Sequence, residues 1–156
     1  MSVNIEVQSQ RSPRRLLGVT LVPRASDAGL LLLRVSVSAS LFLKHGWEKP
    51  TTFSQMAAHF PDPLHIGPVP SLIFALVSDA ICSLLVAAGL LTRFAALWIC
   101  VNLTVAWSLV HHFAYFGRSP LAGHGEVIVL YLAAYLALAV AGPGKYSLDY
   151  RFLSNA

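Results

Sequence analysis

The chain has 156 residues, of which 56% are hydrophobic and only 12% charged, with a formal net charge of +4. Soluble domains carry about 25% charged residues, so this composition argues against an ordinary soluble domain, and the length allows one domain. The basic residues form no face interleaved with aromatic side chains, which argues against nucleic acid as a partner.

The first 27 residues are polar and basic, and we interpret them as a flexible cytoplasmic tail. The apolar stretch at residues 16–22 is too short for a secretory signal peptide and is interrupted by Pro23 and Arg24. The tail therefore precedes the membrane domain, which we expect at residues 28–150, followed by a C-terminal tail at residues 151–156.

Four apolar segments follow the tail in chain order. A helix needs roughly 20 apolar residues to cross a hydrocarbon layer of about 30 Å, and four stretches approach that length: residues 28–43, 71–91, 94–116 and 126–141. The sequence therefore predicts an all-α protein, an integral membrane four-helix bundle.

The connections between these spans differ in length. The first is long, at residues 44–70, and contains five prolines, which disfavour a continuous helix. Within it, "TTFSQMAAHF" could form a short amphipathic helix in the membrane interface. The second and third spans are joined only by Thr92 and Arg93, and a short outer loop at residues 117–125 leads to the fourth.

The distribution of basic residues predicts the orientation, because cytoplasmic loops are enriched in Lys and Arg. With the N-terminus inside, the inner side holds Arg11, Arg14, Arg15, Arg24, Arg93, Lys145 and Arg151, and the outer side holds Lys44, Lys49 and Arg118. This asymmetry predicts that both termini are cytoplasmic and that the long loop is outside. The positive charge then contacts anionic headgroups of the lipid bilayer.

Charged residues inside the spans are the first candidates for a site, because they are costly in a bilayer. Arg34, Asp79 and Glu126 lie within or at the edge of three different spans. Neither Arg34 nor Asp79 is tolerable alone at mid-membrane. We therefore expect Arg34 and Asp79 to form an ion pair, or to share a polar cavity with Glu126.

The stretch "KHGWEKP" at residues 44–50 is interpreted as the rim of an outward-facing polar groove. Arg34, Ser38 and His45 share one helix face, and Gly46 is expected to end the helix so that His45 turns inward while Lys49 stays in water or binds a partner. Together these inferences give a candidate binding groove of Arg34, His45, Lys49, Asp79, His111 and Glu126. The alternative is that His45 faces headgroups and that the lysines bind lipid phosphates.

A second polar stripe follows the third span, where Thr104, Ser108, His111 and Tyr115 recur at helical spacing. Its Ser and Thr residues have an alternative role, because hydroxyl groups in membrane helices usually bond to their own backbone or to a neighbouring helix.

Metal and disulfide sites are not expected. The histidines expected near the outer surface, which are His45, His111, His112 and His124, lack the spacing of a metal site. Cys82 and Cys100 lie at different depths, too far apart for a disulfide, and are interpreted as small buried hydrophobic residues.

Four pieces of the sequence together resemble the DoxX family of small four-helix membrane proteins over about residues 28–150. They are "LLLRVSVSASLFLKHGWEK", "GLLTRFAAL" between the second and third spans, the acidic residue opening the last span, and "AGPGKYSLD" after it. The resemblance maps the family's intramembrane Arg to Arg34, its His-Gly and following Lys to His45, Gly46 and Lys49, and its last-span Glu to Glu126. The family's second-span acid is commonly Glu, whereas this chain has Asp79.

The resemblance implies a multi-pass protein of the cell inner membrane, associated with quinol oxidase, thiosulfate-to-quinone electron transfer or oxidative-stress partners. A quinone headgroup needs hydrogen-bonding groups at the edge of the apolar layer, which His45, Glu126 and Arg34 could supply. No flavin, haem or iron–sulfur motif is visible, so electrons are expected from a membrane or periplasmic redox partner protein.

Two functions follow from these observations. The first is a redox-associated subunit that binds a quinone or another small lipophilic molecule in the bundle. The second is a non-catalytic membrane module that assembles or stabilises a partner oxidoreductase complex. Catalytic activity is left open, and a homo-oligomer is compatible with both.

Overall fold

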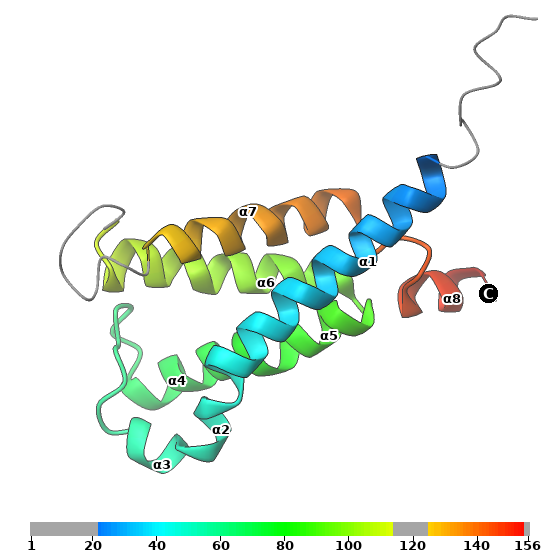
Figure 1. Ribbon diagram of the computed structural model, residues 1–156. Helices are drawn as coiled ribbons and strands as arrows, with labels where there is room; N and C mark the ends of the chain where they lie inside the picture. Colours follow the sequence, from blue (N-terminus) through cyan, green and yellow to red (C-terminus); the bar gives the residue numbers. More distant parts are fainter. Residues whose placement is uncertain (1–21, 114–124, 155–156) are drawn as a thin grey trace, which may run out of the picture.

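The computed structural model describes residues 22–113 and 125–154, and within these ranges the chain is helical and contains no strand. Four long helical segments lie alongside one another (Figure 1). In chain order the elements are α1 (Val22–Leu41), η2 (Phe42–Gly46), α2 (Glu48–Thr51), α3 (Phe53–Met56), α4 (Pro68–Leu76), η3 (Val77–Cys82), α5 (Ser83–Ala88), α6 (Thr92–Val105), η4 (Ala106–Val110), α7 (Gly125–Ala141) and α8 (Leu148–Ser154). The three η segments are π-helical.

Three of the long segments are long and apolar enough to cross a membrane. They comprise Ala25–Thr51, Pro68–Ala88 and Thr92–Val110. The fourth, Gly125–Ala141, is a shorter apolar helix of 17 residues. This composition, in an all-helical chain, supports the predicted membrane protein.

The first segment is longer than predicted because Gly46 does not end it. The chain continues through a π-helical turn into α2, and Trp47 has ordinary helical angles. Gly46 is buried against the next segment, where an added Cβ would lie 2.4 Å from the main-chain oxygen of Asp79. The absent side chain therefore permits close packing rather than a turn.

The turn between the second and third segments lies at residues 89–91 rather than at the predicted Thr92–Arg93. Gly89 ends α5 in the left-handed conformation, with φ of +73°, and Leu91 has φ of +48°. Glycine adopts this region at little cost, so Gly89 fits a helix end. As a result α6 begins at Thr92.

The core lies between these helices. α6 packs against α7 and α5, and α1 packs against α5 and α7. The largest fully buried apolar side chains of this core are Leu41, Ile99, Tyr135 and Leu138. Many large apolar side chains face outward, and three of them, Leu32, Phe94 and Leu130, are 62% exposed or more, as expected for helices in contact with lipid.

The start of α1 and α8 lie at the same end of the bundle, and α2 and α3 lie at the opposite end (Figure 1). Four hydrogen bonds of Asp149 tie α8 to the α5–α6 turn. Its main-chain N–H donates to the carbonyl of Gly89, and its carboxylate accepts from the Leu91 N–H at 2.8 Å and from both the N–H and the hydroxyl of Thr92 at 3.0 Å. A carboxylate at a helix N-terminus satisfies N–H groups that have no partner within the helix.

Candidate functional site

A cavity of about 410 Å³ lies at the α2 end of the bundle. Its walls are mainly apolar and come from the third segment, from α4 and from the connection that precedes α4. The lining residues are Lys49, Phe60, Pro61, Pro63, Leu64, Ile66, Ser71, Phe74, Ala75, Asp79, Asn102, Val105, Ala106, Val110 and His111. A largely apolar cavity of this size with a few polar groups is typical of a small-molecule site.

Three side chains form the polar end of this cavity: Lys49, Asp79 and Asn102. The Lys49 ammonium donates to Asp79 Oδ2 at 2.7 Å, and the Asn102 amide donates to Asp79 Oδ1 at 3.1 Å. Lys49 and Asp79 are only 8% and 6% exposed. Both carboxylate oxygens are thus bonded, as a buried charge requires.

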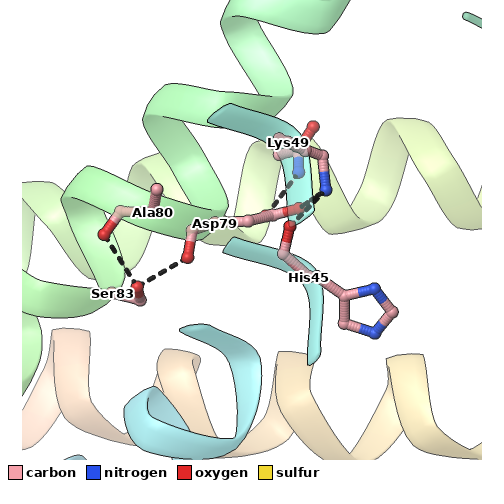
Figure 2. Close-up of polar contacts among 6 residues, drawn as sticks. His45, Lys49, Asp79, Ala80 and Ser83 are labelled. Carbon is pink, nitrogen blue, oxygen red and sulfur yellow. Dashed lines mark hydrogen bonds and ion pairs between the residues drawn. The ribbon is translucent and has the colours of Figure 1, made fainter. Parts of the chain in front are cut away.

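Lys49 has a second acceptor, the main-chain carbonyl of His45, at 2.9 Å. Figure 2 shows the ammonium group between this carbonyl and the Asp79 carboxylate, with the His45 ring pointing away from the pair. Ser83 approaches from the other side, where its hydroxyl donates to the Asp79 carbonyl at 2.6 Å. Backbone and side chain of Asp79 are therefore both held in place.

The three π-helical segments in the described part of the chain lie beside the cavity. η3 contains Asp79, η2 ends shortly before Lys49, and η4 contributes Ala106 and Val110 to the wall. A π-helical turn widens the helix and changes the direction of the residues that follow it, and such turns are frequent at functional sites.

The connection between α3 and α4 covers the cavity and is organised by Asp62. Its carboxylate accepts hydrogen bonds from the main-chain N–H groups of Ile66 and Gly67 and from the Ser71 hydroxyl, at 2.8 to 3.0 Å. Partial desolvation raises the pKa of Asp62, but the three hydrogen bonds and the nearby His65 outweigh it and lower the pKa below its ordinary value. The ionised form of Asp62 therefore stabilises this covering loop.

Arg34 does not form the predicted ion pair with Asp79. It is 2% exposed, and its guanidinium donates to the carbonyl of Pro143 at 2.8 Å and to the carbonyl of Tyr146. An added Cβ at Gly89 would lie 2.2 Å from Arg34 Nη1, so Arg34 reaches the end of α5, about 15 Å of helix away from Asp79.

The direction in which long side chains extend from a helix explains why Asp79 pairs with Lys49 and not with Arg34. Such side chains lean toward the N-terminus of their helix. Arg34 therefore extends toward the end of the bundle where α1 begins, and the basic residue that meets Asp79 comes from farther along the chain. That residue is Lys49. It is buried, whereas the sequence led us to expect it in water or bound to a partner.

The predicted site residues thus fall into separate groups. Lys49, Asp79 and His111 line the cavity, and His45 contributes its carbonyl. Arg34 lies at the opposite end with the segment after α7. Glu126 is exposed in the first turn of α7 and does not line the cavity.

The polar stripe on the third segment has the backbone role given above as the alternative. The Thr104 hydroxyl donates to the Cys100 carbonyl and the Ser108 hydroxyl donates to the Thr104 carbonyl, each at 2.7 Å. Tyr115 lies outside the described residues. On α1, Ser38 is buried and accepts from the Tyr135 hydroxyl of α7 at 3.4 Å.

Cys82 and Cys100 are free and buried, in agreement with the interpretation as small core residues. Within residues 22–113 and 125–154, no group of three or more His, Cys, Asp and Glu side chains could hold a metal ion. His124 lies outside these ranges.

Asn102 and the covering loop belong to the site but were not among the candidate residues predicted from the sequence. Asn102 carried a signal, since an amide within an apolar span is costly and suggests a polar partner. The loop residues Phe60, Leu64 and Ile66 carried none, because their contact with the cavity depends on how a proline-rich connection folds back.

Comparison with known proteins gives two matches to this chain. A family model described as DoxX matches residues 29–112, which include the polar end of the cavity. An uncharacterized protein of Haemophilus influenzae is 30% identical over 127 residues, covering 80% of this chain and 83% of that protein. No solved structure matches.

Proposed function

The chain belongs to the DoxX family, and we propose that it is a redox-associated protein of the inner membrane that binds a quinone or another small lipophilic molecule. The observation that carries this proposal is the cavity of about 410 Å³, mainly apolar along its walls and with Lys49, Asp79 and Asn102 bonded together at one polar end. The headgroup lies at this polar end, and the tail extends along the apolar wall toward lipid.

The polar end supplies the hydrogen bonds that a quinone carbonyl needs. Lys49 and Asn102 are donors beside the cavity, and Asp79 holds both of them in place. Reduction of a quinone to a quinol takes up two electrons and two protons. In this proposal the electrons come from a membrane or periplasmic partner protein, and the protons come from water through the polar end.

Filling the cavity tests the proposal without disturbing its polar end. Ala106 lines the cavity on η4, so Ala106→Phe should occupy the space of the tail and weaken binding of a quinone with a ten-carbon tail by at least tenfold. Val101 lies on α6 and is 55% exposed, so Val101→Phe is the matched control and should bind as the unmodified protein does.

Binding is measured by calorimetric titration in nanodiscs, together with extraction of lipophiles from the purified protein. If the unmodified protein neither retains nor binds a quinone, or if Ala106→Phe binds it equally well, the cavity is not its site. A protein without bound lipophile that always copurifies with a larger oxidoreductase would instead support the non-catalytic assembly module.

A further inference from the structure

We infer that the cavity selects lipophilic molecules with an uncharged, hydrogen-bond-accepting end and rejects lipophilic anions of the same shape. The inference rests on the proposed function, because it specifies the chemical class that the same cavity takes. The feature that carries it is the pairing of Lys49 with Asp79 inside an otherwise apolar cavity.

The charges at the polar end cancel. Lys49 contributes one positive charge and Asp79 one negative charge, with Nζ and Oδ2 2.7 Å apart and both residues more than nine-tenths buried. A single buried lysine would attract a carboxylate, sulfonate or phosphate. Here the carboxylate of Asp79 already occupies that role, so an incoming anion gains no net countercharge.

An anion entering the cavity must also lose its hydration. Transfer of an ionised group into an apolar environment is costly unless a charge of opposite sign compensates it. The charge on the covering loop is also unfavourable, because the Asp62 carboxylate, which accepts from the Ser71 hydroxyl at the cavity wall, has its pKa lowered and is ionised at neutral pH. An uncharged end loses far less hydration on entry.

Donor groups nevertheless remain for an uncharged acceptor. An ammonium has three N–H donors and a carboxamide has two. Lys49 uses two of its donors, on Asp79 and on the His45 carbonyl, and Asn102 uses one. One N–H of Lys49 and one of Asn102 are left at the cavity, which matches a carbonyl or sulfonyl oxygen.

A matched pair of probes separates charge from shape. A long-chain alkyl methyl sulfone and the alkanesulfonate of equal chain length both present sulfur-bound oxygens, but only the sulfonate is charged. All titrations are made at one pH, so that His111, which also lines the cavity, is in the same state for both probes and both proteins before binding. Nanodiscs of uncharged lipid avoid competition from anionic lipid.

Asp79→Asn is the informative variant, because it keeps the size of the side chain and leaves Lys49 with an unbalanced positive charge. The unmodified protein should bind the sulfone at least tenfold more tightly than the sulfonate, and in D79N the sulfonate should gain at least tenfold. Partition of each probe into lipid is the same for both proteins, so the change between them reports the cavity. The K49M/D79N double variant lacks both charges of the pair, so its affinity for the sulfonate should not rise above that of the unmodified protein.

The comparison of the two probes on the unmodified protein decides the matter even if D79N does not fold. Sulfonate binding as tight as sulfone binding there would overturn the inference while leaving quinone binding, and so the proposed function, intact. Failure of the quinone and of both probes to bind the unmodified protein would overturn the proposed function and the inference with it.

Discussion

Lys49 and Asp79 are separated by thirty residues in the sequence, yet their charged atoms lie 2.7 Å apart at the polar end of an apolar cavity. The pair joins the first helical segment to the second. Lys49 follows the π-helical segment η2, and Asp79 lies within the π-helical segment η3. It also lies where the family model matches the chain. The stability of the bundle and the chemistry of the cavity therefore depend on the same two side chains.

Removing one member of this pair should be more harmful than removing both charges. In Lys49→Met, Asp79 keeps its bond from Asn102 but loses its countercharge, and breaking a buried ion pair in this way costs about 3 to 5 kcal/mol. The double variant K49M/D79N lacks both charges of this pair and should recover part of that loss. The measurement is the free energy of unfolding in detergent.

The control for this prediction is Lys44→Met. Lys44 is exposed one turn before the buried lysine, so its removal should change stability by less than about 0.5 kcal/mol. Equal losses in K49M and K44M would mean that the Lys49–Asp79 bond does not stabilise the bundle.

Gly46 should tolerate no side chain. In Gly46→Ala the new Cβ would lie 2.4 Å from the main-chain oxygen of Asp79, so the two segments must separate, at a cost of about 1 to 3 kcal/mol. Gly29→Ala is the matched control, because an added Cβ there meets nothing within 4 Å, and alanine favours a helix by up to about 1 kcal/mol. The midpoint temperature of thermal unfolding should fall in Gly46→Ala and rise in Gly29→Ala. A lower midpoint in both variants would contradict the packing role of Gly46.

Arg34 should hold the segment between α7 and α8 in place. Arg34→Met removes the donor to the carbonyls of Pro143 and Tyr146, and each hydrogen bond to a charged group contributes about 1.5 to 3 kcal/mol. Trypsin should then cut after Lys145, which lies between these two residues, several times faster than in the unmodified protein.

Arg93→Met is the control for the arginine substitution. Arg93 is exposed, and among residues 22–113 and 125–154 it donates one long hydrogen bond, of 3.4 Å, to the Val140 carbonyl. Its loss should leave the rate of cleavage after Lys145 nearly unchanged. Similar acceleration in both variants would show that the segment responds to loss of surface charge rather than to Arg34.

The stability of the covering loop should decrease when the pH falls to the acidic range and should not decrease when it rises. A carboxyl group whose pKa is lowered in the folded state stabilises that state above its unfolded pKa of about 3.9, and this contribution is lost as the pH falls through the lower folded pKa. Hydrogen-exchange protection of the Ile66 and Gly67 amides, which donate to Asp62, should therefore be constant from pH 8 to about pH 5 and decrease below about pH 4.

Asp62→Asn separates this effect from general acid unfolding. The neutral amide accepts hydrogen bonds less strongly, so protection of the same amides should already be reduced at pH 7 and should change little on acidification. Asp27→Asn, which weakens the acceptor of the Lys145 main-chain N–H at the other end of the bundle, should leave the loop unaffected. Retained protection in D62N would rule out Asp62 as the organiser of the loop.

The sequence predicted the helical class and the membrane character because composition and apolar run length depend on local residues. It also located the polar residues that matter, since Lys49 and Asp79 are unusual in or next to apolar spans. It paired Asp79 with Arg34 wrongly, because depth counted along ideal helices ignores the direction in which long side chains lean and the π-helical turns. Likewise, a glycine that permits close packing, such as Gly46, cannot be told from one that ends a helix without knowing what packs against it.

The orientation of the bundle can be tested at its two ends. Glu48 is exposed in α2, and the Lys145 side chain is 59% exposed at the end where α8 lies. The excess of basic residues on the side of Lys145 predicts that this side is cytoplasmic, so a membrane-impermeant maleimide added to intact cells should label Glu48→Cys and should label Lys145→Cys only after the membrane is opened. The unmodified chain is the control, because Cys82 and Cys100 are buried and should give little background. Labelling of both cysteines from outside would mean that an even number of segments crosses the membrane between them, so that the predicted topology is wrong. Exchange of the two labelling patterns would mean that the bundle is inserted with its termini outside.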